Sequence, residues 1–219
     1  DVRGEADLVE EIARVASLTK LEATPLPRPA PGVTERTLTP KQVREAETRR
    51  ALASAGLNEC VTYSFVAEAE AALFGGGRPE MRLANPISSE MSEMRPSLLP
   101  GLMAAAARNQ ARGFADLGLF EVGPVFLGPE PGEQRVEATA LRTGATAPRH
   151  WSGARRPVDL FDARADAEAA LAALGAPRDK LSVAREAPDW FHPGRSGALK
   201  LGPKTTLAVF GELHPRALE

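Results

Sequence analysis

The stretch that decides the fold is NPISSEMSEMRPSLLPGL, which occupies residues 85–102. Its Asn-Pro start predicts a turn, because Pro86 pushes the residue before it out of the helical region. Near its end, Ser97 is expected to cap the next helix, and Pro100 fits a first helical turn, where a missing N–H costs little. Leucine and methionine then recur at helical spacing. The stretch therefore predicts a polar, shaped loop that runs into an amphipathic helix over residues 98–112.

The composition around this stretch is that of a soluble globular protein. The 219 residues are 43% hydrophobic and 26% charged, with a net charge of -2 and a pI of about 6.0. Such a chain is not a polyanion binder as a whole, so a nucleic-acid role requires a local cluster of Lys and Arg. The single cysteine, Cys60, excludes an internal disulfide and a multi-cysteine zinc site, which fits a reducing cytoplasm. The sequence shows no apolar run long enough to span a membrane and no signal peptide, so we expect a cytoplasmic protein with no membrane partner.

The spacing of apolar residues, with Gly and Pro at the boundaries, divides the chain into the helices and strands of an α+β fold. Residues 5–17 are predicted to form a helix, and the prolines within residues 23–33 indicate an extended linker. Gly56 and Gly175 are expected to end two later helices. The strands follow no regular βαβ rhythm, which favours an antiparallel sheet. Beyond the linker, the expected helices are 40–55, 67–74, 98–112 and 162–174, and the expected strands are 59–66, 81–83, 117–122, 124–127, 136–143, 181–185, 196–201 and 205–212.

The histidines of the chain are His150, His192 and His214, and three imidazoles could build a catalytic zinc centre. Each lies in a motif flanked by Pro or Trp, and none has the i, i+4 spacing of a helical metal pair. We therefore expect structural or turn-capping roles for them.

Several acidic and sulfur side chains also have structural interpretations. Asp159 and Asp162 could form a carboxylate pair for acid–base chemistry. A cap by Asp162 on the helix that follows it, with Asp166 and Glu168 on the solvated face, is the favoured interpretation. Cys60 alternates with apolar neighbours on a predicted strand, which is typical of a core residue.

The arginines are scattered and have few aromatic residues between them, which gives weak support to an RNA-contacting surface. The candidates are Arg95, Arg108, Arg112 and Arg195. For Arg95, we expect a loop-ordering role as a hydrogen-bond donor to Glu90 or Glu93. The serines of the same loop lack a nearby base, so a serine nucleophile is not expected.

Five separated blocks of the chain resemble the β subunit of bacterial phenylalanyl-tRNA synthetase. They occur in that family's order and together span nearly the whole chain. The blocks are DVRGEADLVEEIARV (1–15), the stretch at 85–102, LFEVGPVF (119–126), HW (150–151) with RPVDLFDARADAE (156–168), and FHPGRSG (191–197) with GELHP (211–215).

The resemblance implies a domain organisation. Residues 1–22 correspond to the end of a small B5-like domain, residues 23–36 form the Pro-rich linker, and residues 37–219 correspond to a catalytic-like core. That core has the class II synthetase fold, an antiparallel sheet flanked by helices, here preceded by a short helical segment. Because the chain starts without methionine, we read it as a fragment that lacks the family's tRNA-binding, editing and carboxy-terminal domains.

The resemblance also implies a core that has lost catalysis. Class II sites hold ATP with a Phe-Arg-x-Glu strand and a late glycine-rich segment that ends in arginine. Here no arginine stands between Phe120 and Glu121, and the segment around Gly194-Arg195 is too short. Without an arginine at the α-phosphate, adenylate formation loses its main electrostatic support. We therefore expect the chain alone to be inactive, with the family's α subunit supplying the chemistry.

A Mg²⁺ site is implied by the same family, in which an acidic set before the core is associated with Mg²⁺ shared with the α subunit. The matching positions are Asp1, Asp7, Glu10 and Glu11. Hard carboxylate oxygens suit Mg²⁺, and the last three share one helical face. The helix dipole also favours acids in a first turn, and Glu10 can pair with Arg14. We expect weak or no Mg²⁺ binding by this fragment.

The expected function is therefore a non-catalytic core module of phenylalanine–tRNA ligase. It would dock on the α subunit in an α2β2 heterotetramer and support the ATP-dependent charging of tRNA(Phe). The loop at 85–97 and the helix at 98–112 are the expected docking surface, with Leu and Met side chains exposed in the isolated chain. Two alternatives are a free-standing metal-dependent hydrolase, built from the acidic helix and the histidines, and a free RNA-binding module, which the near-neutral pI disfavours.

Overall fold

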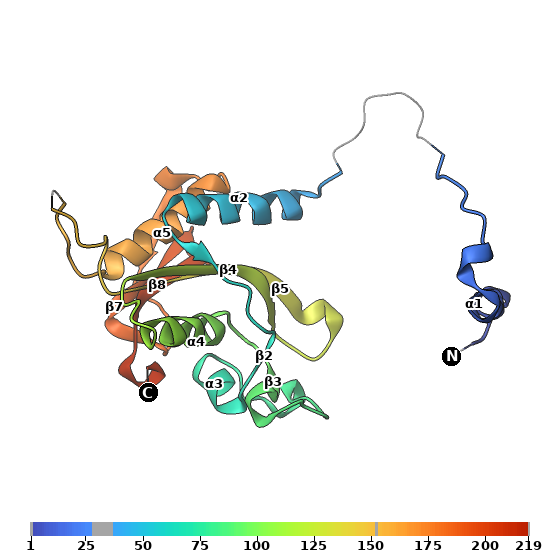
Figure 1. Cartoon of the computed structure of the whole chain (residues 1–219). Coiled ribbons are helices and arrows are strands. Elements are labelled where there is room, and N and C mark those ends of the chain that lie inside the picture. Colours follow the sequence, from blue (N-terminus) through green and yellow to red (C-terminus); the bar gives the residue numbers. More distant parts are fainter. Residues whose placement is uncertain (1, 28–36, 152, 219) are drawn as a thin grey trace. The chain divides into compact units, whose positions relative to one another are not determined.

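The computed structural model describes residues 2–27, 37–151 and 153–218, and it divides the chain into two compact units, Asp1–Thr37 and Leu38–Glu219 (Figure 1). The first unit contains helix α1 (Glu5–Ala16) and a short 3-10 turn, and none of its described residues is buried. The apolar side chains of α1 are therefore exposed. The expected linker at 23–36 falls mostly outside the described residues.

The second unit is built around the antiparallel hairpin of β4 and β5, and β1 pairs with β4 in parallel on its other edge. A second antiparallel sheet has the order β6-β7-β8, and β2 pairs with β3 separately. The strands are β1 (Asn58–Glu59), β2 (Phe65–Val66), β3 (Glu93–Met94), β4 (Leu117–Phe126), β5 (Gln134–Thr143), β6 (Leu181–Ala184), β7 (Phe191–Leu201) and β8 (Thr205–Leu213). The α+β fold with antiparallel sheets is confirmed.

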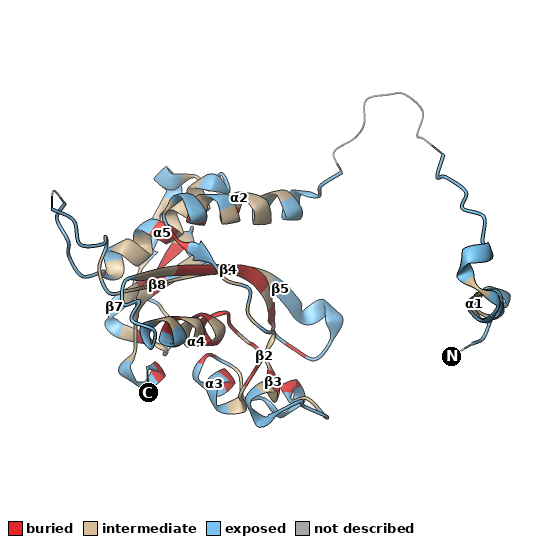
Figure 2. Cartoon of the chain, viewed as in Figure 1, coloured by how far each residue is buried: buried red, intermediate tan, exposed pale blue. Residues whose placement is uncertain are grey.

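Helices cover both faces of the β4–β5 hairpin (Figure 1). On one face Leu52 of α2 packs against Phe120, and on the other Leu102 of α4 packs against Leu119. Leu119 and Phe120 of β4 pack on opposite faces of the sheet because the side chains of a strand alternate between faces. The core therefore follows β4, where buried residues concentrate (Figure 2). The helices of this unit are α2 (Pro40–Ser54), α3 (Glu68–Leu73), α4 (Leu99–Gln110) and α5 (Leu160–Ala173).

The strand expected at 59–66 is interrupted. Its first end pairs with β4 and its last end with β3, and the residues between them, segment 60–64, belong to neither short strand. The strand expected at 81–83 is absent, and a 3-10 turn at Pro79–Met81 takes its place. Only Arg82 forms a bridge there, to Glu93.

β4 is continuous where two strands were expected, and it runs through Pro124. The Pro124 carbonyl accepts a hydrogen bond from Arg95, on the side of β4 away from β5. The N and C=O of one residue in an antiparallel strand point the same way, so the missing N–H of Pro124 removes no ladder bond.

Helix α5 begins earlier than the sequence predicts. Asp159 is its N-cap, accepting the N–H groups of Phe161 and Asp162, so Asp162 lies inside the first turn rather than at the cap. Asp166, expected on the solvated face, is buried and pairs with Arg142. Gly175 ends the helix with a positive φ of 78°, as predicted. None of the helices in the described part of the chain has the length and hydropathy needed to cross a bilayer.

Candidate docking surface

A buried ionic cluster lies between β4 and segment 60–64. The Arg95 Nη1 atom donates to Glu121 Oε1 at 2.8 Å, and the two side chains are only 2% and 4% exposed. Thr62 joins both partners, because its hydroxyl accepts from Arg95 at 2.9 Å and donates to Glu121 at 2.7 Å. Buried charges are tolerated when they are paired and hydrogen-bonded in this way.

Arg95 also fixes the surrounding backbone. Its Nε donates to the Pro124 carbonyl, its own N–H donates to the Ser64 carbonyl, and its carbonyl accepts from Phe126 N–H, at 2.9, 2.9 and 3.0 Å. The side chain and the backbone N–H and C=O of one residue therefore hold segment 60–64 against β4. Arg95 is buried in the interior of the fold. The sequence analysis had predicted only that it orders the preceding loop.

The prediction that Arg95 donates to Glu90 or Glu93 is wrong. Glu90 is exposed in the preceding loop, and Glu121 takes its place as the carboxylate partner. Glu93 is fully buried, but its Oε1 accepts the N–H of Gly77 at 2.7 Å. Its Oε2 has no hydrogen-bond partner among the described residues.

Segment 60–64 presents two exposed side chains to solvent. Thr62 points into the cluster, while Val61 is 91% exposed and Tyr63 is 72% exposed. The close approach of α4 depends on Gly101, because a Cβ there would lie 2.2 Å from the Thr62 hydroxyl. The sequence analysis did not identify Val61 and Tyr63 as part of a surface. The signal was available in their alternation with Cys60 and Thr62, which face inward.

The 85–102 stretch divides into an exposed part and a buried part. Residues 85–90 are exposed, with Ile87 at 90%. Leu98 and Leu102 are fully buried, and Leu99 is nearly so. The expectation that the leucines of this helix would be exposed is therefore wrong. They cover the sheet and the Phe74 side chain, leaving the loop as the accessible part of the predicted docking surface.

The acidic residues of α1 do not converge in the described structure. The Asp7 carboxylate accepts the N–H groups of Arg3 and Gly4, each at 2.8 Å, and these bonds lower the pKa of Asp7. Arg14 pairs with Glu11 rather than with Glu10. Among the described residues, no group of three or more His, Cys, Asp or Glu side chains could hold a metal ion, and Asp1 lies outside them.

Two histidines cap turns, as expected. His192 Nδ1 accepts the N–H of Gly194 at 3.1 Å, and His214 Nδ1 accepts the N–H of Arg216 at 3.2 Å. His150 lies beside Trp151, with ring centroids 5.7 Å apart. None of the three joins a metal-binding group within the described residues, so the hydrolase alternative gains no support.

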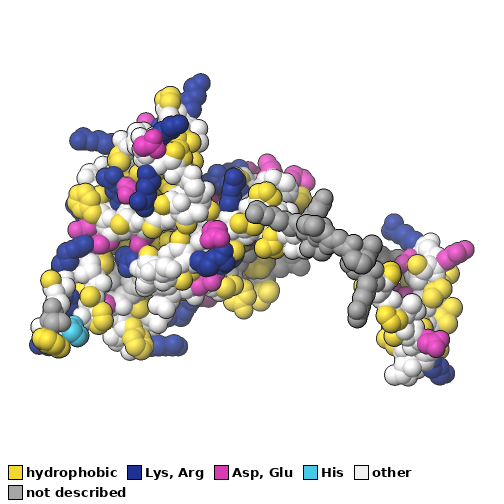
Figure 3. Space-filling view, turned by 90° about the horizontal axis from the view of Figure 1, so that it is seen from above, with side chains coloured by type: hydrophobic (Ala, Val, Ile, Leu, Met, Phe, Trp, Pro, Cys, Tyr) yellow, Lys and Arg dark blue, Asp and Glu magenta, His cyan; other side chains and the backbone are white. Residues whose placement is uncertain are grey.

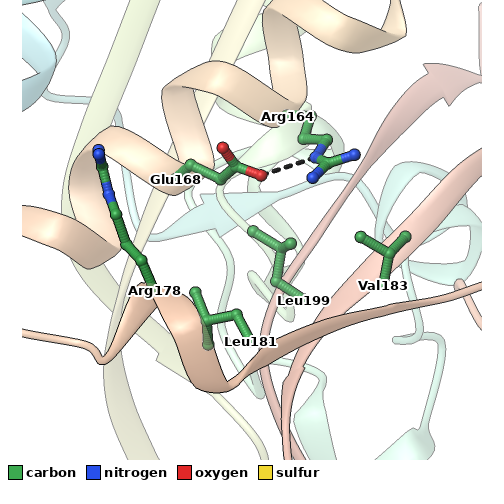
Figure 4. Close-up of a pocket in the computed structure, with 6 residues that line it drawn as sticks. All are labelled: Arg164, Glu168, Arg178, Leu181, Val183 and Leu199. Carbon is green, nitrogen blue, oxygen red and sulfur yellow. Dashed lines mark hydrogen bonds and ion pairs between the residues drawn. The ribbon is translucent and has the colours of Figure 1, made fainter.

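A pocket of about 240 Å³ lies between α5 and the sheet of β6 and β7 (Figure 4). Figure 4 shows Arg164 and Glu168 paired along one wall, with the Arg178 guanidinium pointing away from them. The Arg164–Glu168 pair neutralises the wall, so few polar groups converge on a ligand. A second pocket lies around Phe191 and His214, and no residue of β4 or β5 lines either one.

Cys60 lies at the edge of the α4 core. It packs partly buried against the cluster of Leu102, Ala106 and Leu119, as the sequence predicts. Burial, followed by the nearby Glu121 charge, raises the pKa of the Cys60 thiol. The thiol therefore packs as a small apolar group at the edge of this core.

Comparisons with known proteins agree with this architecture. Residues 25–219 match the family described as the phenylalanyl tRNA synthetase beta chain CLM domain. Relatives named phenylalanine–tRNA ligase beta subunit are 65% identical in Cereibacter sphaeroides, 63% in Ruegeria pomeroyi and 53% in Brucella suis. Each match covers the whole of this chain, which spans only 27 to 28% of those relatives' length.

The solved structures most informative for the fold are pyrrolysyl tRNA synthetases of Desulfitobacterium hafniense. One, described as PylSc, superposes with a TM-score of 0.54 at 16% identity, over 93% of this chain and 64% of that chain. A second gives 0.52, also at 16% identity, over 76% of this chain and 57% of that chain. The likeness shows a class II synthetase fold. With the family match over residues 25–219, the chain belongs to the phenylalanyl tRNA synthetase beta chain family, as its CLM domain.

Proposed function

We propose that this chain is a non-catalytic core module of a phenylalanine–tRNA ligase beta subunit. It docks on the alpha subunit and supports ATP-dependent charging of tRNA(Phe). The observation that carries the proposal is the pairing of a buried ionic cluster with an exposed apolar segment. Arg95 and Glu121 hold segment 60–64 against β4, and that segment offers Val61 and Tyr63 to a partner.

The arginines of the β4–β5 hairpin support the absence of catalysis. An arginine that stabilises a transferring phosphate must keep its guanidinium available for that phosphate. Here Arg95 and Arg142 are each bound to a largely buried carboxylate, and Arg135 pairs with Glu137 at the surface.

The exposed residues fit the contact with an obligate partner. Such interfaces are large and apolar, and tyrosine is enriched in them. Three apolar side chains are exposed in this chain. They are Val61 and Tyr63 on segment 60–64, and Ile87 in the first half of the 85–102 stretch. We assign them to the alpha-subunit contact, in place of the leucines that the fold buries.

The intact enzyme supplies what this chain lacks. We propose an α2β2 heterotetramer in the cytoplasm, with residues 1–22 as the end of a B5-like domain, residues 23–36 as the linker and residues 37–219 as the core. ATP is a substrate of the holoenzyme. Mg²⁺ neutralises phosphate charge when bound, and the acidic set contributes to its site only with groups from outside this chain. That set is Asp1, Asp7, Glu10 and Glu11.

Co-purification tests this proposal in the full-length beta subunit expressed with its alpha subunit. Val61→Asp places a charge in the proposed contact, and Val183→Asp is a matched control on β6, where the valine is also exposed. We expect the first variant to lose at least about tenfold in complex affinity, because a charge is stranded in an apolar interface. The control should assemble normally and keep phenylalanine-dependent pyrophosphate exchange.

Two results would contradict the proposal. One is wild-type assembly by the Val61→Asp variant. The other is pyrophosphate exchange by this 219-residue chain in highly purified form without the alpha subunit.

A further inference from the structure

We propose that the second pocket, a cavity of about 280 Å³ around Phe191, binds a free α-amino acid with an apolar side chain. Arg185 binds the carboxylate of this ligand, and Asp189 binds its ammonium group. None of the described residues that line the pocket belongs to segment 60–64 or to the 85–102 stretch. The inference therefore goes beyond the proposed function and does not depend on the alpha-subunit contact.

The pocket is formed where the connection between β6 and β7 meets the end of β8. Phe191 is the first residue of β7 and is buried, while His214 directly follows β8. The N–H of Phe191 donates to the Pro188 carbonyl at 3.0 Å, and the N–H of His214 donates to the Trp190 carbonyl at 2.8 Å. These bonds tie both segments to the start of β7, so the pocket has a defined shape without a ligand.

Two charges of opposite sign line the pocket and are unpaired. Neither Arg185 nor Asp189 forms an ion pair or a side-chain hydrogen bond within the described residues, and they do not pair with each other. By contrast, Glu186, the neighbour of Arg185, pairs with Lys200 at 2.6 Å. Figure 3 also shows acidic side chains beside cationic ones over much of the visible face of the second unit. An unpaired cation and an unpaired anion at one pocket therefore distinguish this site from the surface around it.

These two charges select a zwitterion. The guanidinium of Arg185 offers a planar set of donors that matches a carboxylate, and the carboxylate of Asp189 accepts hydrogen bonds from an ammonium group. An anion alone would leave Asp189 unpaired, and a cation alone would leave Arg185 unpaired. An α-amino acid carries both groups on one carbon, so it neutralises both charges at once.

Two further side chains complete the polar part of the pocket. His214 Nδ1 already accepts the N–H of Arg216 at 3.2 Å, so the neutral ring carries its proton on Nε2 and has a donor left for a carboxylate. The Ser196 hydroxyl donates to the His192 carbonyl at 2.8 Å, which leaves its lone pairs to accept from an ammonium group. The pocket therefore offers each charged group of the ligand a second partner of suitable polarity.

The remaining lining residues are apolar and indicate the side chain of the ligand. They are Ala187, Pro188, Phe191 and Pro193. A volume of about 280 Å³ lies at the lower end for ligand pockets, which suits a single amino acid rather than a peptide. The first pocket has no comparable arrangement, because its Arg164 and Glu168 pair with each other.

Isothermal titration of the assembled full-length enzyme with L-leucine tests this site. Leucine is the probe because phenylalanine would also occupy the catalytic site of the proposed holoenzyme. Isocaproate and isoamylamine keep the leucine side chain, and each lacks one of the two charged groups. Each should bind at least about tenfold more weakly than leucine, because one charged hydrogen-bonding group is lost.

Two variants separate the roles of the charged residues. Asp189→Asn should raise the Kd of leucine by about tenfold and should not weaken isocaproate, which has no ammonium group. Arg185→Gln should weaken leucine and isocaproate and leave isoamylamine unchanged. A variant that merely disturbed the fold would weaken all three ligands.

The matched controls are Arg178→Gln and Asp179→Asn. They change exposed residues of the same two charges that do not line this pocket. Both controls should bind leucine with the wild-type Kd.

Absence of leucine binding by the wild-type enzyme, or an unchanged leucine Kd in both pocket variants, would overturn the inference. If those variants kept the leucine Kd and lost the alpha subunit, Arg185 and Asp189 would belong to a protein contact instead. Failure of the alpha subunit to associate with the wild-type chain would contradict the proposed function, whereas the same titration on the beta subunit alone would still test this site.

Discussion

Two arginine–carboxylate pairs in this molecule have the same chemistry and different environments. Arg95 and Glu121 are 2% and 4% exposed, inside the cluster beneath segment 60–64. Arg155 and Asp116 are 47% and 28% exposed, where the segment between β5 and α5 meets the start of β4. The buried pair cannot lose one partner without leaving a charge in the interior, whereas water can replace either partner of the exposed pair. The first pair is therefore needed for the fold, and the second only orients a surface loop.

Glu121→Ala should give the largest separation between the two environments. The substitution leaves the Arg95 guanidinium buried without its partner, so we expect a loss of about 3–5 kcal/mol in the free energy of unfolding. Arg155→Ala should cost at most about 1 kcal/mol, the upper value for an exposed pair. Urea unfolding of both variants measures the difference, and equal losses would contradict the distinction.

Leu102→Ala compares the two halves of the 85–102 stretch. Leu102 is fully buried against β4, so its truncation should cost about 2–5 kcal/mol by removing contacts and leaving a cavity. Ile87→Ala should change stability by no more than about 0.5 kcal/mol, because Ile87 is 90% exposed. Unfolding midpoints in urea decide this, and a large loss from Ile87→Ala would show that the loop is part of the core.

Acid should break the ion pair between Arg156 and Asp162 in the first turn of α5. The Arg156 hydrogen bonds lower the pKa of Asp162 below the ordinary value of an aspartate. The pair therefore stabilises the folded state fully above about pH 4, and this contribution is lost as the pH falls through the lowered pKa. Asp162→Asn should flatten the acid side of the stability–pH curve. A variant with the wild-type acid dependence would exclude Arg156–Asp162 as its source.

Mg²⁺ should have the smallest effect. Asp7 is engaged with backbone N–H groups and Glu11 with Arg14, so we expect this chain to bind Mg²⁺ weakly or not at all. Isothermal titration measures this directly. Micromolar affinity would show that the acidic set of α1 forms a site without further domains.

Local rules predicted much of the fold. Gly56 and Gly175 mark helix ends because their positive φ angles, 84° and 78°, favour glycine. Most helices and the strands of the second sheet follow from periodicity and composition in the same way. The bounds of α5 moved because two aspartates, Asp159 and Asp162, could each cap it, and only the backbone geometry decides between them.

The partners of buried charges could not be predicted in this way. Arg95 meets Glu121, and Arg142 meets Asp166, across 26 and 24 residues of sequence. Closeness in sequence suggested Glu90 or Glu93 for Arg95, because all three lie in the same loop. The exposure of Leu102 was mispredicted for the same reason, because the sheet that buries it is assembled from distant strands.

The contact between Thr62 and Gly101 has a mechanical consequence. Val61 and Tyr63 lie on one side of segment 60–64, while Thr62 fills the space beside α4 and bonds to Glu121 on the other. Closely packed elements transmit displacement because they have no free volume to absorb it. A partner that presses on Val61 and Tyr63 therefore loads α4 and β4 together. Segment 60–64 therefore links a contact made at the surface to the centre of the sheet.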